Sequence, residues 1–249
     1  ELGGLASLIS KIPAKNRLAD FPHYLMHRAE QLDNLYIFKN TEGTPENIRK
    51  FHPNIIVSST GSAPLLPPIA GLKDRIDNEN HNIYSILGMI SHINDFPKDL
   101  EGKKVVVVGG GAVGLDVVEF FADRNADISI VEMMDQIGRD LDPVSKNDTK
   151  TMMKKHNVHQ LTKTALLEVK DSSFLVRGDG EPYELPFEYG FVCLGMRAQG
   201  QLYQNLTEEF SSEDVEIMNI GDSQRARRII DGTQEGRNIL TILEQKGYF

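Results

Sequence analysis

The fold of this chain is decided by the stretch Val105-Val106-Val107-Val108-Gly109-Gly110-Gly111-Ala112-Val113-Gly114. The four valines predict a buried strand, and the spacing that follows predicts a helix over residues 112–124. Gly109, Gly111 and Gly114 fill a G-x-G-x-x-G pattern: the first allows a tight turn, the second lets a pyrophosphate approach the backbone, and the third lets the helix pack on the strand. The N-terminus of the helix then offers free N–H groups to phosphates.

A second strand, over residues 127–131, completes a strand–helix–strand unit. Glu132 ends this strand, 23 residues after Gly109, where an acidic side chain meets the ribose hydroxyls of a bound dinucleotide. A tight turn without a ligand is the alternative, but the flanking elements favour a binding site. The sequence therefore predicts a dinucleotide site formed by Gly109, Gly110, Gly111, Ala112, Val113, Gly114, Glu132 and Met133.

Glu132 also predicts a preference for NAD(H) over NADP. A 2′-phosphate beside it would meet a like charge, and two unit charges 4 Å apart repel by about 4 kcal/mol at an effective dielectric of about 20. Met133 and Met134 bring no compensating cation, whereas the cation of Arg139, a few residues later, would favour NADP.

Composition limits the classes of function. The 249 residues include 27 Lys+Arg and 36 Asp+Glu, a net charge of −9, which disfavours a nucleic-acid partner. At roughly 150 residues per domain, the length predicts one or two domains. The uncharged run 51–72 holds four prolines, so it is not a membrane helix and no membrane partner is predicted.

Cysteine and histidine usage argues against metal or disulfide chemistry. Cys193 is the one cysteine, so it forms no internal disulfide and no cysteine cluster for zinc or iron–sulfur. Its apolar strand predicts a small buried residue. His23 and His27 lack a third ligand nearby and are predicted to face solvent. A reducing, cytoplasmic location fits this composition best.

Apolar spacing and turn residues predict the remaining elements. They are a loop over 1–16, a helix over 17–32, a strand over 34–38, a short helix opened by Thr44-Pro45, a strand over 54–57, a helix over 82–93, a helix over 144–156, an antiparallel meander of 158–170, 173–177 and 182–185, strands over 189–194 and 215–220, and a helix over 227–244.

Two further strands end in small or polar residues. Ser59-Thr60-Gly61 follows strand 54–57, and Gly221-Asp222 follows strand 215–220. Open α/β sheets bind ligands at the carboxyl ends of their strands, so each motif is a candidate ligand contact, with a plain turn as the alternative.

Taken in order, these motifs resemble a known family. They are similar to the C-terminal module of multidomain NADH:flavin oxidoreductases related to old yellow enzyme, such as 2,4-dienoyl-CoA reductase, 2-enoate reductase and trimethylamine dehydrogenase. The segments that carry the resemblance are Gly3-Gly4, Lys11-Ile12-Pro13, the run 59–64, the glycine loop, Gly221-Asp222 and the run 227–232. That module has the two-dinucleotide fold of pyridine nucleotide–disulfide oxidoreductases.

The resemblance implies an α/β fold class. A Rossmann-like NAD(P)-binding domain over 69–195, with a parallel sheet and an antiparallel meander, is inserted in an incomplete FAD-binding domain over 1–68 and 196–249. It also implies that Gly195 lies near the nicotinamide, and that FAD is lined by Gly3, Gly4, Thr60, Gly61 and Asp222.

The family's first G-x-G-x-x-G unit, its FMN barrel and its 4Fe–4S cysteines have no counterpart in this sequence. The resemblance therefore implies a fragment whose partners are the barrel and the ADP-binding segment of a parent chain, and which binds FAD poorly by itself. In the parent, hydride passes from NADH to FAD, and electrons continue through FMN and 4Fe–4S centres to an enoate or enone.

Two alternatives remain open at this point. One is a non-catalytic ADP-binding or electron-transfer scaffold, and the other is an NADH dehydrogenase with a ferredoxin or quinone acceptor. No side chain is assigned a catalytic role. Arg225, Arg227 and Arg228 form either a solvated face or a contact to phosphate or flavin, and Glu119 lies either on the surface or near the nicotinamide.

Overall fold

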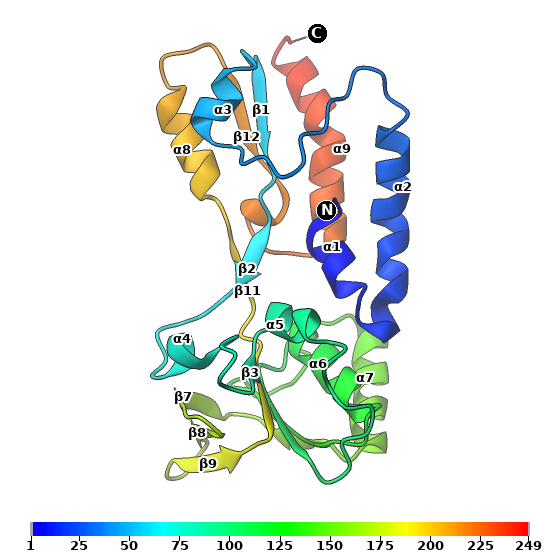
Figure 1. The fold of residues 1–249 in the computed structure, drawn as a ribbon, viewed down its shortest axis with the longest axis vertical. Helices are drawn as coiled ribbons and strands as arrows, with labels where there is room; N and C mark the ends of the chain where they lie inside the picture. The colour runs from blue at the N-terminus through cyan, green and yellow to red at the C-terminus, as the bar shows by residue number, and fades with distance from the viewer. Residues whose placement is uncertain (1, 249) are drawn as a thin grey trace. The chain divides into compact units, whose positions relative to one another are not determined.

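The computed structural model describes residues 2–248 and divides the chain into two compact units (Figure 1). Of these residues, the first unit holds 2–5, 24–63 and 196–248, and the second holds 6–23 and 64–195. Two of the four places where the chain changes unit lie at β2 (Ser62–Pro64) and just before β11 (Met196–Ala198), which pair with each other.

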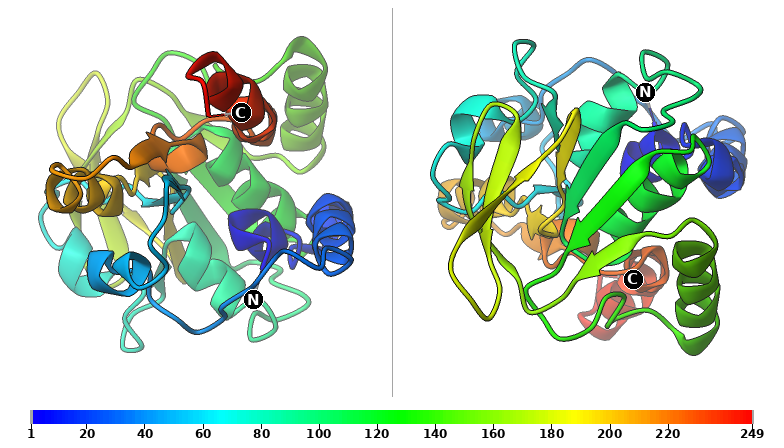
Figure 2. Two further views of the ribbon diagram at one scale, coloured as in Figure 1. Left: turned by 90° about the horizontal axis from the view of Figure 1, so that it is seen from above. Right: turned by 90° about the horizontal axis from the view of Figure 1, so that it is seen from below.

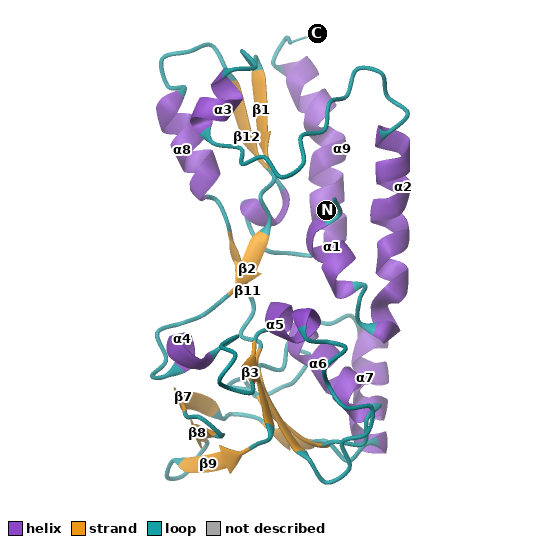
Figure 3. Ribbon diagram, in the orientation of Figure 1, coloured by secondary structure: helices purple, strands orange, loops and turns teal. Residues whose placement is uncertain are grey.

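The second unit is built on a five-stranded parallel sheet (Figure 3). Its strands lie in the order β3 (Ile83–Tyr84), β10 (Tyr189–Val192), β4 (Lys104–Val108), β5 (Asp127–Val131) and β6 (His159–Leu161). The predicted strands 104–108 and 127–131 have the bounds expected of them. The predicted α/β class with a parallel sheet is confirmed.

Strand β4 is buried on both faces because it lies in the middle layer of three. Val105 and Val107 belong to a core that α5 (Ile86–Ser91), α6 (Ala112–Ala122) and α7 (Pro143–Lys155) help to form. Val106 and Val108 pack on the opposite face, against the antiparallel meander β7 (Ala165–Val169), β8 (Ser173–Arg177) and β9 (Tyr183–Pro186) (Figure 2). A strand covered on both faces needs a continuous apolar run, which the four valines supply.

The first unit has a smaller core. Strands β1 (Ile55–Ser58) and β12 (Glu216–Asn219) pair in parallel. Ile56 packs with Leu206 and Phe210 beneath α3 (Pro45–Arg49) and α8 (Gln201–Glu209). Thr44 caps α3 as predicted, because its hydroxyl accepts the N–H of Asn47 at 3.2 Å. The remaining elements are α1 (Gly4–Ile9), η1 (Pro13–Ala19), α2 (Asp20–Ala29), α4 (Leu72–Arg75), η2 (Gly221–Ser223) and α9 (Ile229–Gln245).

Four predicted elements differ from the structure. The loop over 1–16 is wrong, since α1 and η1 form there. No strand forms over 34–38, where Tyr36 is 77 % exposed and has no neighbouring strand to pair with. The segment 158–170 divides between β6 of the parallel sheet and β7 of the meander, and the segment 82–93 divides between β3 and α5. Helix α8 was not predicted.

Residues 6–23 pack within the second unit, although the predicted domain bounds place them in the FAD part. The reason is Ile12, which is 1 % exposed and lies in the core that α6 helps to form. The assignment of the units to FAD and NAD stays a prediction. Between residues 2 and 248, no helix has both the length and the apolar character needed to cross a bilayer.

Candidate functional site

Three glycines shape the loop between β4 and α6. Gly109 has a φ of +109°, and a Cβ atom on it would lie 2.1 Å from the carbonyl oxygen of Cys193. A Cβ atom on Gly114 would lie 1.9 Å from the carbonyl oxygen of Gly109. At Gly111, by contrast, no heavy atom lies within 4 Å of the Cβ position. Packing therefore requires two of the glycines, while Gly111 borders open space.

The N-terminus of α6 faces this loop without a cap. Gly111 is the N-cap residue, no side chain accepts the first N–H groups, and the first turn carries no acidic residue. Those N–H groups have no carbonyl partner within the helix, and the positive end of the helix dipole adds to them. This arrangement binds phosphate groups.

A cavity of about 580 Å³ opens beside the loop. Its size is typical of sites for small ligands and cofactors. Its walls are Pro67, Ile69, Val108, Gly109, Gly111, Ala112, Val113, Val131, Glu132, Met133, Asp140, Thr164, Ala165, Leu166, Cys193, Leu194 and Gly195. The cavity thus brings together most of the predicted dinucleotide residues, whereas Gly110 and Gly114 lie outside its lining.

Glu132 fastens two backbone segments at the edge of this cavity. Its Oε2 accepts the N–H of Gly110 at 2.7 Å, and its Oε1 accepts the N–H of Met134 at 2.7 Å. The N–H of Gly138 donates to the carbonyl of Gly110 at 2.7 Å. A carboxylate offers about four acceptor positions, so Glu132 keeps about two for the hydroxyls of a ribose.

Cys193 lies at the cavity wall but is unreactive. Its backbone N–H donates to the carbonyl of Val108 at 2.7 Å, and the residue is 7 % exposed, which confirms the predicted burial. Burial raises the pKa of the thiol to about 12, so the sulfur stays protonated at neutral pH and is a poor nucleophile. Gly195, two residues on, has a φ of +102° and open space at its Cβ position.

An ion-pair cluster that sequence reasoning did not find lies on α6. Lys15 Nζ is 3.0 Å from Asp116 Oδ1 and 3.2 Å from Glu119 Oε2. The cluster borders a second cavity, of about 390 Å³, between α6 and α7. The i, i+3 spacing of the two acids places them on one helix face, but only the fold brings Lys15 to them. Glu119, whose position the sequence left open, is thus an ion-pair partner.

Burial and charge oppose each other in this cluster. Burial raises the pKa of the Asp116 carboxyl, and the lowering effect of Lys15 does not cancel it. For Lys15, burial lowers the pKa of the ammonium, but Asp116 and Glu119 outweigh burial and raise it. The ion pair therefore offsets part of the cost of holding Asp116 away from water.

Lys15→Met is expected to destabilise the protein by about 1–2 kcal/mol near neutral pH, between the values for exposed and buried pairs. Without its cation, the pKa of Asp116 rises further. The native state then holds this proton more tightly than the unfolded state does, so stability falls as pH rises above the ordinary carboxyl value. Urea unfolding at about pH 4.5 and about pH 7.5 measures this, with the larger loss expected at the higher pH.

Lys11→Met is the matched control, because Lys11 is exposed and its side chain has no ion pair or hydrogen bond among residues 2–248. A loss of stability for Lys15→Met that is equal at the two pH values would show that Asp116 does not depend on Lys15.

In the first unit, the residues that follow β1 and β12 meet. The Ser62 hydroxyl donates to Asp222 Oδ2 at 3.0 Å, and the Arg227 backbone N–H donates to Asp222 Oδ1 at 3.0 Å. The Thr60 hydroxyl donates to the carbonyl of Gln199 at 2.5 Å. The turns after the two strands are therefore joined through Asp222 and its neighbours.

Gly61 and the N-terminal glycines have left-handed backbones. Gly61 has a φ of +76° and accepts the N–H of Gln199 at 2.9 Å. Gly3 and Gly4 have φ values of +102° and +52° at the start of α1, and in the part of the chain that the structure describes no hydrogen bond joins them to Asp222. The structure therefore brings Thr60, Gly61 and Asp222 together but does not link the N-terminal glycines to them.

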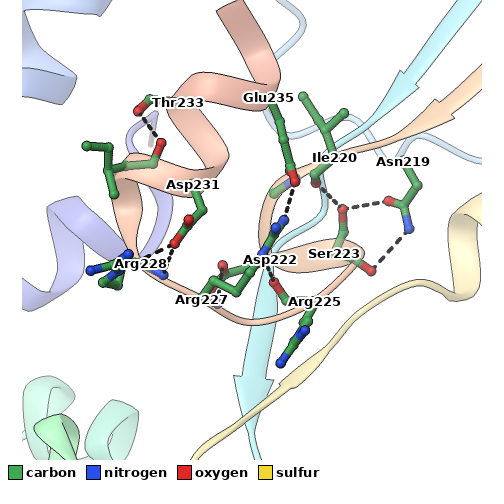
Figure 4. A network of polar contacts seen from close by, with 12 residues as sticks. Asn219, Ile220, Asp222, Ser223, Arg225, Arg227, Arg228, Asp231, Thr233 and Glu235 are labelled. Carbon is green, nitrogen blue, oxygen red and sulfur yellow. Dashed lines mark hydrogen bonds and ion pairs between the residues drawn. The ribbon is translucent and has the colours of Figure 1, made fainter. Parts of the chain in front are cut away.

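Two of the three arginines beyond Asp222 are neutralised by carboxylates of α9 (Figure 4). Arg227 pairs with Glu235, which also accepts the N–H of Gly221 at 2.6 Å. The hydrogen bond from Arg227 lowers the pKa of Glu235. Arg228 pairs with Asp231. Of these three arginines, Arg225 is the one whose side chain has no hydrogen bond or ion pair within residues 2–248. The structure also holds no cluster of three or more metal-ligating side chains over this range.

The family described as pyridine nucleotide-disulphide oxidoreductase matches residues 27–218. An NADH oxidase from Thermoanaerobacter brockii is 25 % identical over 236 residues, covering 94 % of this chain and 35 % of the relative. A bilirubin reductase from Mediterraneibacter gnavus is 25 % identical over 246 residues, covering 97 % and 35 %. The chain spans about a third of the length of these relatives.

Solved structures share the fold at low sequence identity. A 2-naphthoyl-CoA reductase complex superposes with a TM-score of 0.77 at 22 % identity, covering 94 % of this chain and 33 % of that protein. Histamine dehydrogenase from Rhizobium sp. 4-9 gives a TM-score of 0.77 at 15 % identity, covering 96 % and 37 %.

Proposed function

Because this chain belongs to the pyridine nucleotide-disulphide oxidoreductase family, we propose that its second unit binds NADH for reduction of a flavin. When bound, the two cofactors supply hydride transfer from the nicotinamide to the flavin, and the protein supplies position and electrostatics. The family uses FAD together with NAD(P), and we propose NADH rather than NADPH as the hydride donor of this protein.

One observation carries the proposal: a single cavity joins open space at Gly111, the uncapped start of α6 and the carboxylate of Glu132. The backbone N–H groups of Ala112 and Val113 would hold the pyrophosphate, and Glu132 would accept the ribose hydroxyls. Met133 and Gly195 line the same cavity, as the adenosine and nicotinamide ends of a dinucleotide require.

Glu132→Gln tests the preference for NADH. The change removes the negative charge at nearly constant size, so NADPH affinity is expected to rise about 10-fold, which corresponds to about 1.4 kcal/mol. NADH affinity should fall by a few fold, because an amide offers one acceptor oxygen in place of two. Calorimetry with both nucleotides measures the ratio.

Glu101→Gln is the control, since Glu101 is an exposed acid in the turn before β4 and does not line the cavity. A wild-type protein that binds neither nucleotide would contradict the proposal. A wild-type protein that binds NADPH at least as well as NADH would contradict the preference alone.

The first unit is proposed to hold the flavin end of FAD. Each carboxylate oxygen of Asp222 accepts one hydrogen bond from the protein, which leaves about two acceptor positions for a polyol chain. The turn at Thr60 and Gly61 meets the same end of the small sheet, and Gly3 and Gly4 are proposed to approach the flavin through their backbones.

For the whole protein, we propose that electrons continue through FMN and 4Fe–4S centres to an enoate or enone. Support comes from the family resemblance and from relatives named for organic acceptors, such as the bilirubin reductase and a cinnamate reductase from Clostridium sporogenes. A non-catalytic scaffold is the second candidate. Anaerobic titration of the whole protein with NADH separates the two, because only the first candidate bleaches the flavin.

A further inference from the structure

A second carboxylate shares the cavity with Glu132. Asp140 lines the wall, and these two are the charged side chains among the lining residues, with no lysine, arginine or histidine beside them in the part of the chain that the structure describes. Arg139, which the sequence set against an NADH preference, is exposed and does not line the cavity. The next residue, Asp140, lines the cavity instead.

The loop that carries Asp140 is tied down on both sides. The N–H of Gly138 donates to the carbonyl of Gly110 at 2.7 Å, and the N–H of Leu141 donates to Gly138 at 3.1 Å. On the other side, Asp142 caps α7 through the N–H groups of Val144 and Ser145. The backbone at residue 140 is therefore fixed to the phosphate loop and to a helix start.

The side chain of Asp140 makes no polar contact that would stabilise the fold. It is exposed and has no hydrogen bond or ion pair within residues 2–248. Glu132 differs, because both of its oxygens hold backbone N–H groups. The negative charge of Asp140 therefore acts on a bound ligand without compensation by a hydrogen bond or ion pair from the protein.

We propose that Asp140 is a second specificity-determining residue, which acts with Glu132 to reject nucleotides that carry a 2′-phosphate. The proposal rests on the proposed dinucleotide site. A phosphate monoester carries about −1.5 to −2 charges near neutral pH, so two carboxylates that line the cavity repel it. The neutral hydroxyls of NADH meet no such repulsion and donate hydrogen bonds to carboxylates.

Asp140→Asn is the cleaner test of charge, because it removes no hydrogen bond. We expect NADPH affinity to rise about 3- to 10-fold, with NADH affinity changed by less than about 2-fold. Since salt screens charges near the surface, the gain should shrink between about 0.02 M and about 0.5 M salt. Calorimetry on the full chain with NADH and NADPH gives these values.

Asp135→Asn is the matched control, an exposed acid in the same loop that does not line the cavity. The proposal is overturned if Asp140→Asn leaves NADPH affinity unchanged, or if Asp135→Asn raises it equally. A wild-type protein that does not bind NADH, or whose binding is unaffected by Gly111→Val, would instead overturn the proposed dinucleotide site.

Discussion

Gly111→Val is expected to weaken NADH binding by at least about 10-fold, or about 1.4 kcal/mol, while the fold is retained. The Cβ position of Gly111 has no heavy atom within 4 Å, so a branched side chain enters the space proposed for the pyrophosphate rather than the protein core. Gly111 has a φ of −78° and a ψ of −179°, which valine adopts readily. The substitution is therefore expected to weaken ligand binding and to leave stability unchanged.

For this variant, calorimetry measures the affinity for NADH, and thermal unfolding measures whether the fold is retained. Gly180→Val is the control, since Gly180 lies in the loop between β8 and β9 and also has open space at its Cβ position. If Gly111→Val binds NADH as the wild type does, the loop is not the phosphate site. If the variant unfolds, the open space is not available to the side chain.

The sequence predicts the β4–α6–β5 part of the second unit well because its signals are local. Four consecutive valines, a glycine turn and an apolar helix follow one another, and the bounds of β4 and β5 agree with the prediction. The predicted family is confirmed, since its match covers residues 27–218. Motifs of this kind are recognised from spacing because their chemistry requires a fixed order of strand, turn and helix.

Features that depend on distant contacts could not be predicted. Lys15 meets Asp116 only because Ile12 anchors its segment in the core. Asp140 reaches the cavity wall because Gly138 is bonded to Gly110. Neither contact leaves a pattern in the local sequence, so the candidate site was predicted without its second carboxylate and without the neighbouring ion pairs.

Apolar spacing predicts a helix over 17–32, and α2 forms within that range over residues 20–29, but the spacing does not predict burial. Phe21, Leu25 and Leu32 follow helical spacing but are 45 %, 47 % and 54 % exposed. Over 34–38, where the predicted strand does not form, the apolar side chains are exposed as well. Periodicity predicts an apolar face, and burial requires a partner for that face.

Gly114→Ala is expected to lower stability by about 3–5 kcal/mol, whereas Gly111→Val is expected to lower NADH affinity and retain the fold. The added Cβ atom would lie 1.9 Å from the carbonyl oxygen of Gly109, a backbone atom that cannot move aside as a side chain does. Gly109 cannot retreat, because its N–H donates to the carbonyl of Val131 at 2.8 Å. Relief therefore requires α6 to move away from β4, which opens the main core of the second unit. Urea unfolding followed by near-ultraviolet circular dichroism measures the loss, since Tyr84 and Tyr189 pack in that core. Gly111→Ala is the control and should change stability by less than about 0.5 kcal/mol. Equal stability of the two alanine variants would show that α6 does not depend on close contact at Gly114.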